Sequence, residues 1–192
     1  YLPKEYVDQF QIPVLPLTVN WEGKSYFDGI DIQAEEFYLQ LGQSKSMATT
    51  SQVTVGQFLE VFGKLLDAGK QVLYLGISSG ISATINSALQ ASAELGNPEN
   101  LIVFDSKIVS MALGLMVLEV ARAAEKGASL KECYELAQDA VGRIGVFFTV
   151  DTLEYLHRGG RINSAKRLLG SALNLKPIME IRDGKIELVE SV

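Results

Sequence analysis

An alternation of short apolar runs with amphipathic segments constrains the fold of this chain more than any other feature. The runs Val72–Ile77, Leu101–Phe104 and Val146–Val150 have the length and the aliphatic composition of fully buried strands. Segments with helical periodicity separate these runs, and the connections between them are short. This order predicts an α/β fold in which a parallel sheet is flanked by helices on both faces.

Four helices are expected in the same region because their start and stop signals are present. Thr54-Val55-Gly56-Gln57 and Ser129-Leu130-Lys131-Glu132 are capping boxes, in which the first and last side chains satisfy backbone N–H groups at a helix start. Gly69, Gly96 and Gly127 stand where helices are expected to end. The expected helices run from Thr54 to Gly69, from Ser82 to about Leu95, from about Ile108 to Lys126, and from Ser129 to about Ile144.

The first quarter of the chain has a less regular pattern. Val14–Asn20 predicts an edge strand, because prolines stand before and inside it, and Ser25–Phe27 predicts a short returning strand. Asp31 is expected to cap a helix over Ala34–Leu41. The segment Gln43–Gln52 is polar and has no periodicity, so it predicts a loop.

The pattern changes again from about Phe147 and predicts the beginning of a second domain. We expect residues 1–146 to form a first α/β domain and residues 147–192 to begin a second α/β domain that is truncated, just as a first strand is expected to be missing before Tyr1. Asp183-Gly184 is a strong hairpin signal. The expected elements are a helical turn over Thr152–His157, a helix from Asn163 to about Leu173, and strands over Pro177–Ile181 and Lys185–Val189.

Composition excludes several classes of partner and site. The 192 residues carry a net charge of −6, which argues against nucleic acid or an anionic membrane as the main partner. No apolar run approaches the roughly 20 residues that a membrane span needs, so we expect no stable membrane insertion. Cys133 is the one cysteine, which excludes an internal disulfide and suits a reducing, cytoplasmic compartment. A metal site is not expected, because one histidine and one cysteine leave only carboxylate ligands.

The segment Gln71–Thr84 places several hydroxyls between a strand and a helix. Ser78, Ser79, Ser82 and Thr84 lie in or just after the turn that follows the buried strand. A helix start presents unpaired N–H groups and the positive end of the helix dipole, and both favour an anion. The alternative is that one serine caps the helix and the others fill the turn. Ligands of parallel sheets bind beyond the carboxyl ends of the strands, where Asp105-Ser106 and Asp151-Thr152 are also expected.

The same turn matches a motif of serine hydrolases. Gly76-Ile77-Ser78-Ser79-Gly80 fits the G-x-S-x-G nucleophile elbow in a strand–turn–helix context. Ser78, then Asp105 or Asp139, then His157 would form a catalytic triad in the order that this motif requires. His157, however, stands at a helix end, where a polar or cationic residue is expected for structural reasons alone. A serine hydrolase is therefore the alternative function.

Four stretches of the sequence resemble the motifs of one known family. The family has Thr-Ser-Gln-Pro where this chain has Thr50-Ser51-Gln52-Val53, and Ile-Ser-Ser-x-Leu-Ser-Gly-Thr where this chain has Ile77–Thr84. Val150–Ile162 matches Val-Asp-Thr-Leu-x-Tyr-Leu-x-x-Gly-Gly-Arg-Ile almost throughout, and Leu169–Ile178 resembles Leu-Gly-x-x-Leu-x-Ile-Lys-Pro-Ile. By these residues the chain resembles the DegV family, bacterial fatty-acid-binding proteins that serve as the acyl-binding subunit of fatty acid kinase.

The resemblance implies a binding protein rather than an enzyme. Family members hold a long-chain fatty acid in an apolar tunnel, and a threonine of the first motif and a serine of the second bond its carboxylate. Carried over, these two residues are Thr50 and Ser82, with Ser51, Ser78 and Ser79 as neighbours.

The chain departs from the family pattern at two positions near the expected site. Val53 stands where the family has a proline, and Ala83 stands where the family has the glycine that follows the binding serine. If that glycine approaches the carboxylate closely, the methyl group of Ala83 is expected to weaken or reshape the head-group site.

The resemblance also implies a partner. A separate ATP-dependent fatty acid kinase would phosphorylate the presented carboxylate to an acyl phosphate for phospholipid metabolism in a bacterial cytoplasm, with no cofactor and no catalytic residue supplied by this chain. A relative that binds another apolar carboxylate without any kinase is a further alternative. The basic residues Arg158, Arg161, Lys166 and Arg167 form a candidate docking face for the kinase. The alternative is that they form an ordinary solvent-exposed surface, as a run of basic residues usually does.

Overall fold

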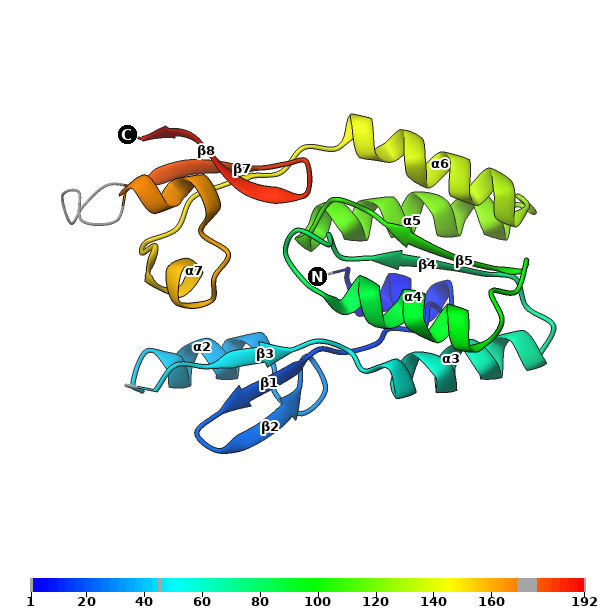
Figure 1. Cartoon of the computed structure of the whole chain (residues 1–192), viewed down its shortest axis with the longest axis horizontal. Coiled ribbons are helices and arrows are strands. Elements are labelled where there is room, and N and C mark those ends of the chain that lie inside the picture. Colours follow the sequence, from blue (N-terminus) through cyan, green and yellow to red (C-terminus); the bar gives the residue numbers. More distant parts are fainter. Residues whose placement is uncertain (1, 45, 169–175, 192) are drawn as a thin grey trace.

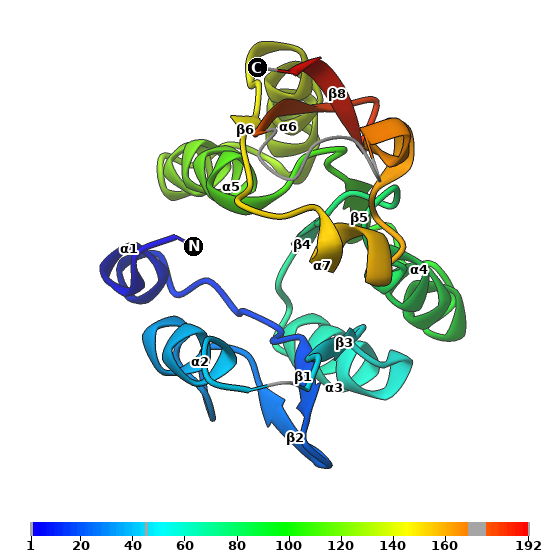
Figure 2. The ribbon, with the colours of Figure 1, turned by 90° about the vertical axis from the view of Figure 1, so that its left-hand side faces the viewer.

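The computed structural model describes residues 2–44, 46–168 and 176–191. A pair of parallel strands lies between layers of helices, in the right-hand half of Figure 1. The two strands are β4 (Val72–Gly76) and β5 (Leu101–Asp105). They pair in register from Val72 opposite Leu101 to Gly76 opposite Asp105. Helices cover both faces of the pair, as the sequence predicts for an α/β fold (Figure 2). One face carries α3 (Val55–Asp67) and α4 (Thr84–Glu94), and the other carries α5 (Ser110–Glu125) and α6 (Leu130–Arg143).

The parallel strands are apolar throughout because their alternate side chains pack on different pairs of helices. Val72 and Tyr74 belong to the core on the side of α3 and α4, where Phe58 and Phe62 are buried. Leu73, between them in β4, packs on the core that α5 and α6 form on the opposite face. A strand that is buried on both sides has a continuous hydrophobic sequence. The two parallel strands could therefore be predicted from the sequence.

An antiparallel sheet with the strand order β2–β1–β3 precedes this layer. It consists of β1 (Thr18–Trp21), β2 (Lys24–Phe27) and β3 (Thr49–Ser51). The prediction of a loop over Gln43–Gln52 is wrong at β3, where Thr50 pairs with Val19 of β1. All three residues of β3 are exposed, so the strand has no hydrophobic alternation and depends on pairing with a distant segment.

Two further expectations for this part need correction. The predicted strand over Val14–Asn20 begins only at Thr18, and two prolines without N–H groups flank or interrupt its first half. The helix α2 (Ala34–Leu41) has the predicted bounds, but Asp31 does not cap it. Asp31 Oδ2 accepts a hydrogen bond from the backbone N–H of Phe27 at 2.8 Å and closes a turn instead. A short helix, α1 (Lys4–Gln9), lies near the start of the chain.

A third sheet, also antiparallel, is formed by the C-terminal part in the order β6–β7–β8. The predicted hairpin is confirmed, because β7 and β8 pair across Asp183 and Gly184, whose φ angles of 50° and 78° suit a two-residue hairpin turn. The prediction of a parallel strand over Val146–Val150 is wrong, because its two strand residues pair antiparallel with β7. The strands are β6 (Phe147–Phe148), β7 (Pro177–Arg182) and β8 (Lys185–Ser191).

Two short helices connect β6 to β7. The helix α7 (Glu154–Arg158) confirms the predicted helical turn, and η1 (Asn163–Leu168) is a 3-10 helix where an α-helix was expected to begin. Asn163 is the first residue of η1 rather than its cap, and the expected continuation to Leu173 lies outside the described residues. Ile162, Met179 and Ile186 belong to the buried core that joins these elements to the third sheet.

The division into a domain of residues 1–146 and the start of another at residue 147 stays a prediction. None of the helices in the described part of the chain combines the length and the apolar character that crossing a membrane requires.

Candidate functional site

A cavity of about 310 Å³ lies where three separate parts of the chain meet. The carboxyl ends of β4 and β5 point toward this side of the molecule, where β3 and α7 also lie (Figure 1). The cavity is lined by Leu17, Thr50, Ser51, Gln52, Ser82, Ala83 and Arg161. The structure therefore brings Thr50, Ser51, Ser82 and Ala83 together, as expected from the sequence motifs.

The first wall of the cavity is the end of β3, and pairing with β1 fixes it. Thr50 lies opposite Val19, and Ser51 Oγ accepts a hydrogen bond of 2.8 Å from the side-chain amide of Asn20. Gln52 reaches across to α4, where its side-chain amide donates to Ser87 Oγ at 2.9 Å. Thr50 itself lines the cavity, and no hydrogen bond to its hydroxyl is present among the described residues.

The second wall is the turn that begins α4. Ser82 Oγ lies 2.9 Å from Thr84 Oγ1 and accepts a hydrogen bond from the Thr84 N–H at 3.3 Å. Ala83 occupies the N-cap position of α4, but the hydroxyl of Ser82 bonds the N–H of Thr84, the first helical residue, so the alternative that a serine caps this helix stays open. The methyl group of Ala83 lines the cavity beside Ser82. Ser82 and Ala83, the two residues just before the start of α4, thus line the same cavity.

The third wall is Arg161, a residue of the basic run that the sequence offers as a candidate docking face. Its Nε donates to the carbonyl oxygen of Ile81 at 3.1 Å, and its Nη1 donates to the carbonyl oxygen of Gly159. These bonds hold a positive charge at the wall of the cavity, although the side chain is exposed. The family motif Gly-Gly-Arg-Ile marks Arg161 in the sequence. Nothing near this motif, however, indicates that Arg161 contacts the turn between β4 and α4.

Of the other basic residues of the candidate docking face, Arg158 is the one whose side chain the structure describes, and it does not line the cavity. Arg158 lies on the exposed surface of α7 and pairs with Glu154 at 3.0 Å. The side chains of Lys166 and Arg167 lie outside the described part of the structure. A single basic face over all four residues therefore stays a prediction.

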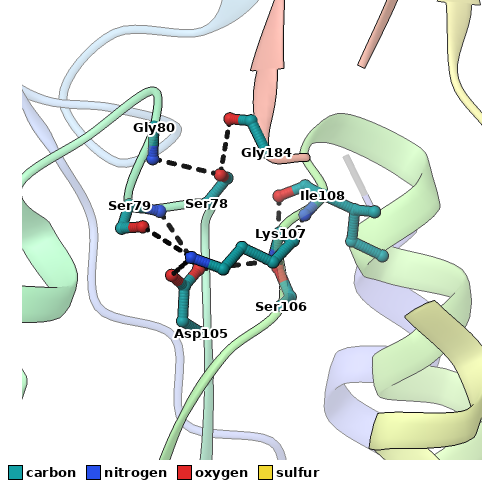
Figure 3. A network of polar contacts seen from close by, with 8 residues as sticks. All are labelled: Ser78, Ser79, Gly80, Asp105, Ser106, Lys107, Ile108 and Gly184. Carbon is teal, nitrogen blue, oxygen red and sulfur yellow. Dashed lines mark hydrogen bonds and ion pairs between the residues drawn. The ribbon is translucent and has the colours of Figure 1, made fainter. Parts of the chain in front are cut away.

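Ser78 and Ser79, the other expected neighbours of the carboxylate, do not line the cavity. Ser78 is fully buried, and its Oγ donates to the carbonyl oxygen of Gly184 at 2.7 Å (Figure 3). Ser79 is held on the opposite side of the turn, where its N–H donates to Asp105 and its Oγ accepts from Lys107 at 3.0 Å. Both serines hold the turn in place, and neither contacts the cavity.

Asp105 stabilises the same turn as a charged group. Burial opposes ionisation of its carboxyl, but hydrogen bonds from Lys107 and Ser79 together outweigh this effect and hold the pKa of Asp105 below its usual value. The Lys107 ammonium also forms an ion pair with Asp105 at 2.6 Å. Because the folded-state pKa is lowered, the stabilisation is present above the usual pKa of an aspartate and is lost as the pH falls through the lowered pKa.

The catalytic triad of the alternative function is not assembled. Ser78 Oγ donates to a backbone carbonyl rather than to a base, and Asp105 is engaged by Ser79 and Lys107. Asp139 pairs with an arginine on α6, and His157 lies on the exposed side of α7, with no hydrogen bond to these residues in the described structure. Asp151-Thr152, expected at the edge of the parallel sheet, follows β6 of the antiparallel sheet instead.

We predict that a fluorophosphonate probe will not label Ser78. The hydroxyl is buried, its proton is held by the Gly184 carbonyl, and no general base is in contact with it. Intact-protein mass spectrometry after incubation with the probe measures the labelled fraction, with an active serine hydrolase as the positive control. Stoichiometric labelling that disappears in Ser78→Ala would restore the hydrolase as the function.

The family to which the chain belongs follows from its matches to known proteins. The model of the DegV family, described as a family of uncharacterised proteins, matches residues 1–192. A DegV domain-containing protein from Caldanaerobacter subterraneus is 37% identical over 191 residues, and the match covers 100% of this chain and 68% of that protein.

Solved structures of similar proteins have the same fold. A fatty-acid-binding DegV family protein from Thermus thermophilus superposes with a TM-score of 0.90 at 33% identity, over 100% of this chain and 68% of that one. A stearic-acid-binding protein from Eubacterium ventriosum gives 0.87 at 30% identity, over 100% and 67%. The fatty-acid-binding DegV of Bacillus subtilis gives 0.86 at 31% identity, over 97% and 66%. Because the family model matches this chain from residue 1 to residue 192, the chain belongs to the DegV family.

Proposed function

We propose that this chain binds a long-chain fatty acid and holds the carboxylate of this ligand in the cavity between β3 and α4. The observation that carries the proposal is the convergence of Thr50, Ser82 and Arg161 on one cavity, from three distant parts of the sequence. The relatives from Thermus thermophilus and Eubacterium ventriosum, described as binding a fatty acid and stearic acid, support this choice of ligand.

The lining of the cavity suits a carboxylate. The hydroxyls of Thr50 and Ser82 can donate to its oxygens, and the start of α4 adds the positive end of a helix dipole. Arg161 contributes a full positive charge, and hydrogen bonds between charged partners are stronger than neutral ones. In a chain with a net charge of −6, these groups make the cavity locally favourable for an anion.

The free energy of binding divides unequally between the tail and the head group. Burial of a CH₂ group contributes about 0.8 kcal/mol, so a tail of about 14 methylenes contributes about 11 kcal/mol before the costs of association. Each hydrogen bond to the carboxylate contributes about 1.5–3 kcal/mol. The tail therefore supplies most of the affinity, and the hydroxyls fix the position of the carboxylate.

Presentation of the head group to a separate ATP-dependent kinase is the second part of the proposal. Thr50, Ser51 and Arg161 are exposed at the cavity, so a bound carboxylate would lie within reach of a partner protein. In the transfer, a carboxylate oxygen attacks the γ-phosphorus of ATP, the bond to ADP breaks, and an acyl phosphate forms. We place this reaction in the phospholipid metabolism of a bacterial cytoplasm, with the exposed Arg158 of α7 as a docking residue.

The double variant Thr50→Val with Ser82→Ala tests the head-group site. It removes two hydroxyl donors at nearly constant volume, so we predict that the affinity for oleate falls by roughly 10²- to 10⁴-fold. The affinity for oleyl alcohol, which has the same tail and no carboxylate, should fall far less. Competitive displacement of a fluorescent fatty acid measures both affinities.

The fold should survive this double change, and thermal unfolding provides the control. If these side chains only stabilise their own turns, the double variant will lose thermal stability but keep the wild-type ratio of oleate affinity to oleyl alcohol affinity. That outcome would contradict the assigned site.

A pair of arginine variants separates carboxylate binding from kinase docking. We predict that Arg161→Gln lowers the affinity for oleate about tenfold at low salt, because a positive charge at the cavity wall is lost. Added salt should reduce the difference in oleate affinity between the wild-type protein and this variant. Arg158→Gln, its matched control on α7, should leave oleate affinity unchanged and reduce only kinase-dependent phosphorylation. Isothermal titration with oleate and a phosphorylation assay with a fatty acid kinase measure the two effects. Equal oleate affinities in both variants would remove Arg161 from the site.

A further inference from the structure

The turn of the β7–β8 hairpin is fastened to the turn between β4 and α4 (Figure 3). Ser78 Oγ donates to the carbonyl oxygen of Gly184 at 2.7 Å and accepts a hydrogen bond from the Gly80 N–H at 3.2 Å. Ser78 is 0% exposed, so water does not compete for these bonds. Its hydroxyl joins two turns that lie 106 positions apart in the sequence.

Two glycines allow these turns to approach so closely. A Cβ atom on Gly80 would collide with the carbonyl oxygen of Gly184 and lie 2.9 Å from Cγ of Lys185. A Cβ atom on Gly184 would collide with Ser78 Oγ and lie 3.2 Å from Cδ of Lys107. Any side chain at either position would therefore push the hairpin away from the turn before α4.

The contact extends from the hairpin to the cavity through the backbone of the turn. The carbonyl oxygen of Ser78 accepts hydrogen bonds from the N–H groups of Ile81 and Ser82, both at 3.0 Å. The Ile81 side chain packs on the core around Met179 and Ile186 in the third sheet. Ser78 thus contacts the hairpin through its hydroxyl and holds the backbone of Ser82 through its carbonyl.

We infer that the hairpin positions the carboxylate-binding side of the cavity, and this inference rests on the proposed function. We define the contact of Ser78, Gly80 and Gly184 as the hairpin latch. The latch fixes the Ser82 hydroxyl and the start of α4 at a set distance from β3, although none of its residues lines the cavity. Recognition of the carboxylate then depends on the docked hairpin, whereas binding of the apolar tail depends on it much less.

The variant Gly80→Ala opens the latch by adding one methyl group. Gly80 does not have a positive φ, so alanine causes no backbone strain there and acts through the collision with Gly184. We expect the affinity for oleate to fall tenfold or more and the affinity for oleyl alcohol to change less than twofold. Gly145→Ala is the matched control, because its Cβ would make only an ordinary contact of 3.5 Å with the ring of Phe147.

A second variant and a spectroscopic measurement make the test independent of the folding of Gly80→Ala. Ser78→Ala adds no atoms and removes the hydroxyl of the latch, so the ratio of the oleate affinity to the oleyl alcohol affinity should fall in the same direction. The carboxyl carbon of [1-¹³C]oleate reports the environment of the head group by NMR. In both variants its resonance should shift toward that of oleate in solvent, while the tail stays bound.

The outcomes separate the latch from the site itself. If wild-type protein binds oleate no better than oleyl alcohol, the proposed function fails. If wild-type protein prefers oleate and the variants keep both that preference and the wild-type carboxyl resonance, the inference that the hairpin positions the site is wrong. Equal losses of affinity for oleate and for oleyl alcohol would show that the contact only stabilises the fold, and this result would also overturn the inference.

Discussion

The turn between β4 and α4 is held at both ends by groups from the C-terminal part of the chain. The Gly184 carbonyl accepts from Ser78 at one end, and the Arg161 guanidinium donates to the carbonyl of Ile81 at the other. The strand β4 ends at Gly76, just before this turn. A Cβ atom at Gly76 would lie 2.9 Å from the side chains of Ile85 and Tyr74, so the chain packs closely there. Because the cavity forms between this turn and β3, its shape depends on contacts that span most of the sequence.

The charges around the turn are arranged so that an anion meets little repulsion. Asp105 lies directly behind the turn, but Lys107 neutralises it at 2.6 Å, and Ser79 donates to it through its N–H. Among the described residues that line the cavity, Arg161 carries a full positive charge, and the positive end of the α4 dipole adds to it. A protein with a net charge of −6 can in this way be locally positive at the cavity, as the proposed carboxylate ligand requires.

Sequence reasoning succeeded where the signal is local. The capping box at Thr54 and the hairpin at Asp183-Gly184 are both present, because a few adjacent residues determine each of them. The strand that carries Thr50 was missed, since it is exposed and forms only by pairing with β1. The position of Arg161 at the cavity was missed for a similar reason, because its partner Ile81 lies 80 positions away. Family motifs named the cavity residues Thr50 and Ser82, but only the fold shows that Ser78 is buried against the hairpin turn and does not line the cavity.

Native mass spectrometry of the purified chain, before and after incubation with oleate or palmitate, tests the central claim most directly. The account predicts a complex whose added mass equals one fatty acid per chain, either already present after purification or formed on incubation. Extraction and analysis of the lipid would identify a ligand that co-purifies. Protein that is consistently empty and takes up neither fatty acid would contradict the account.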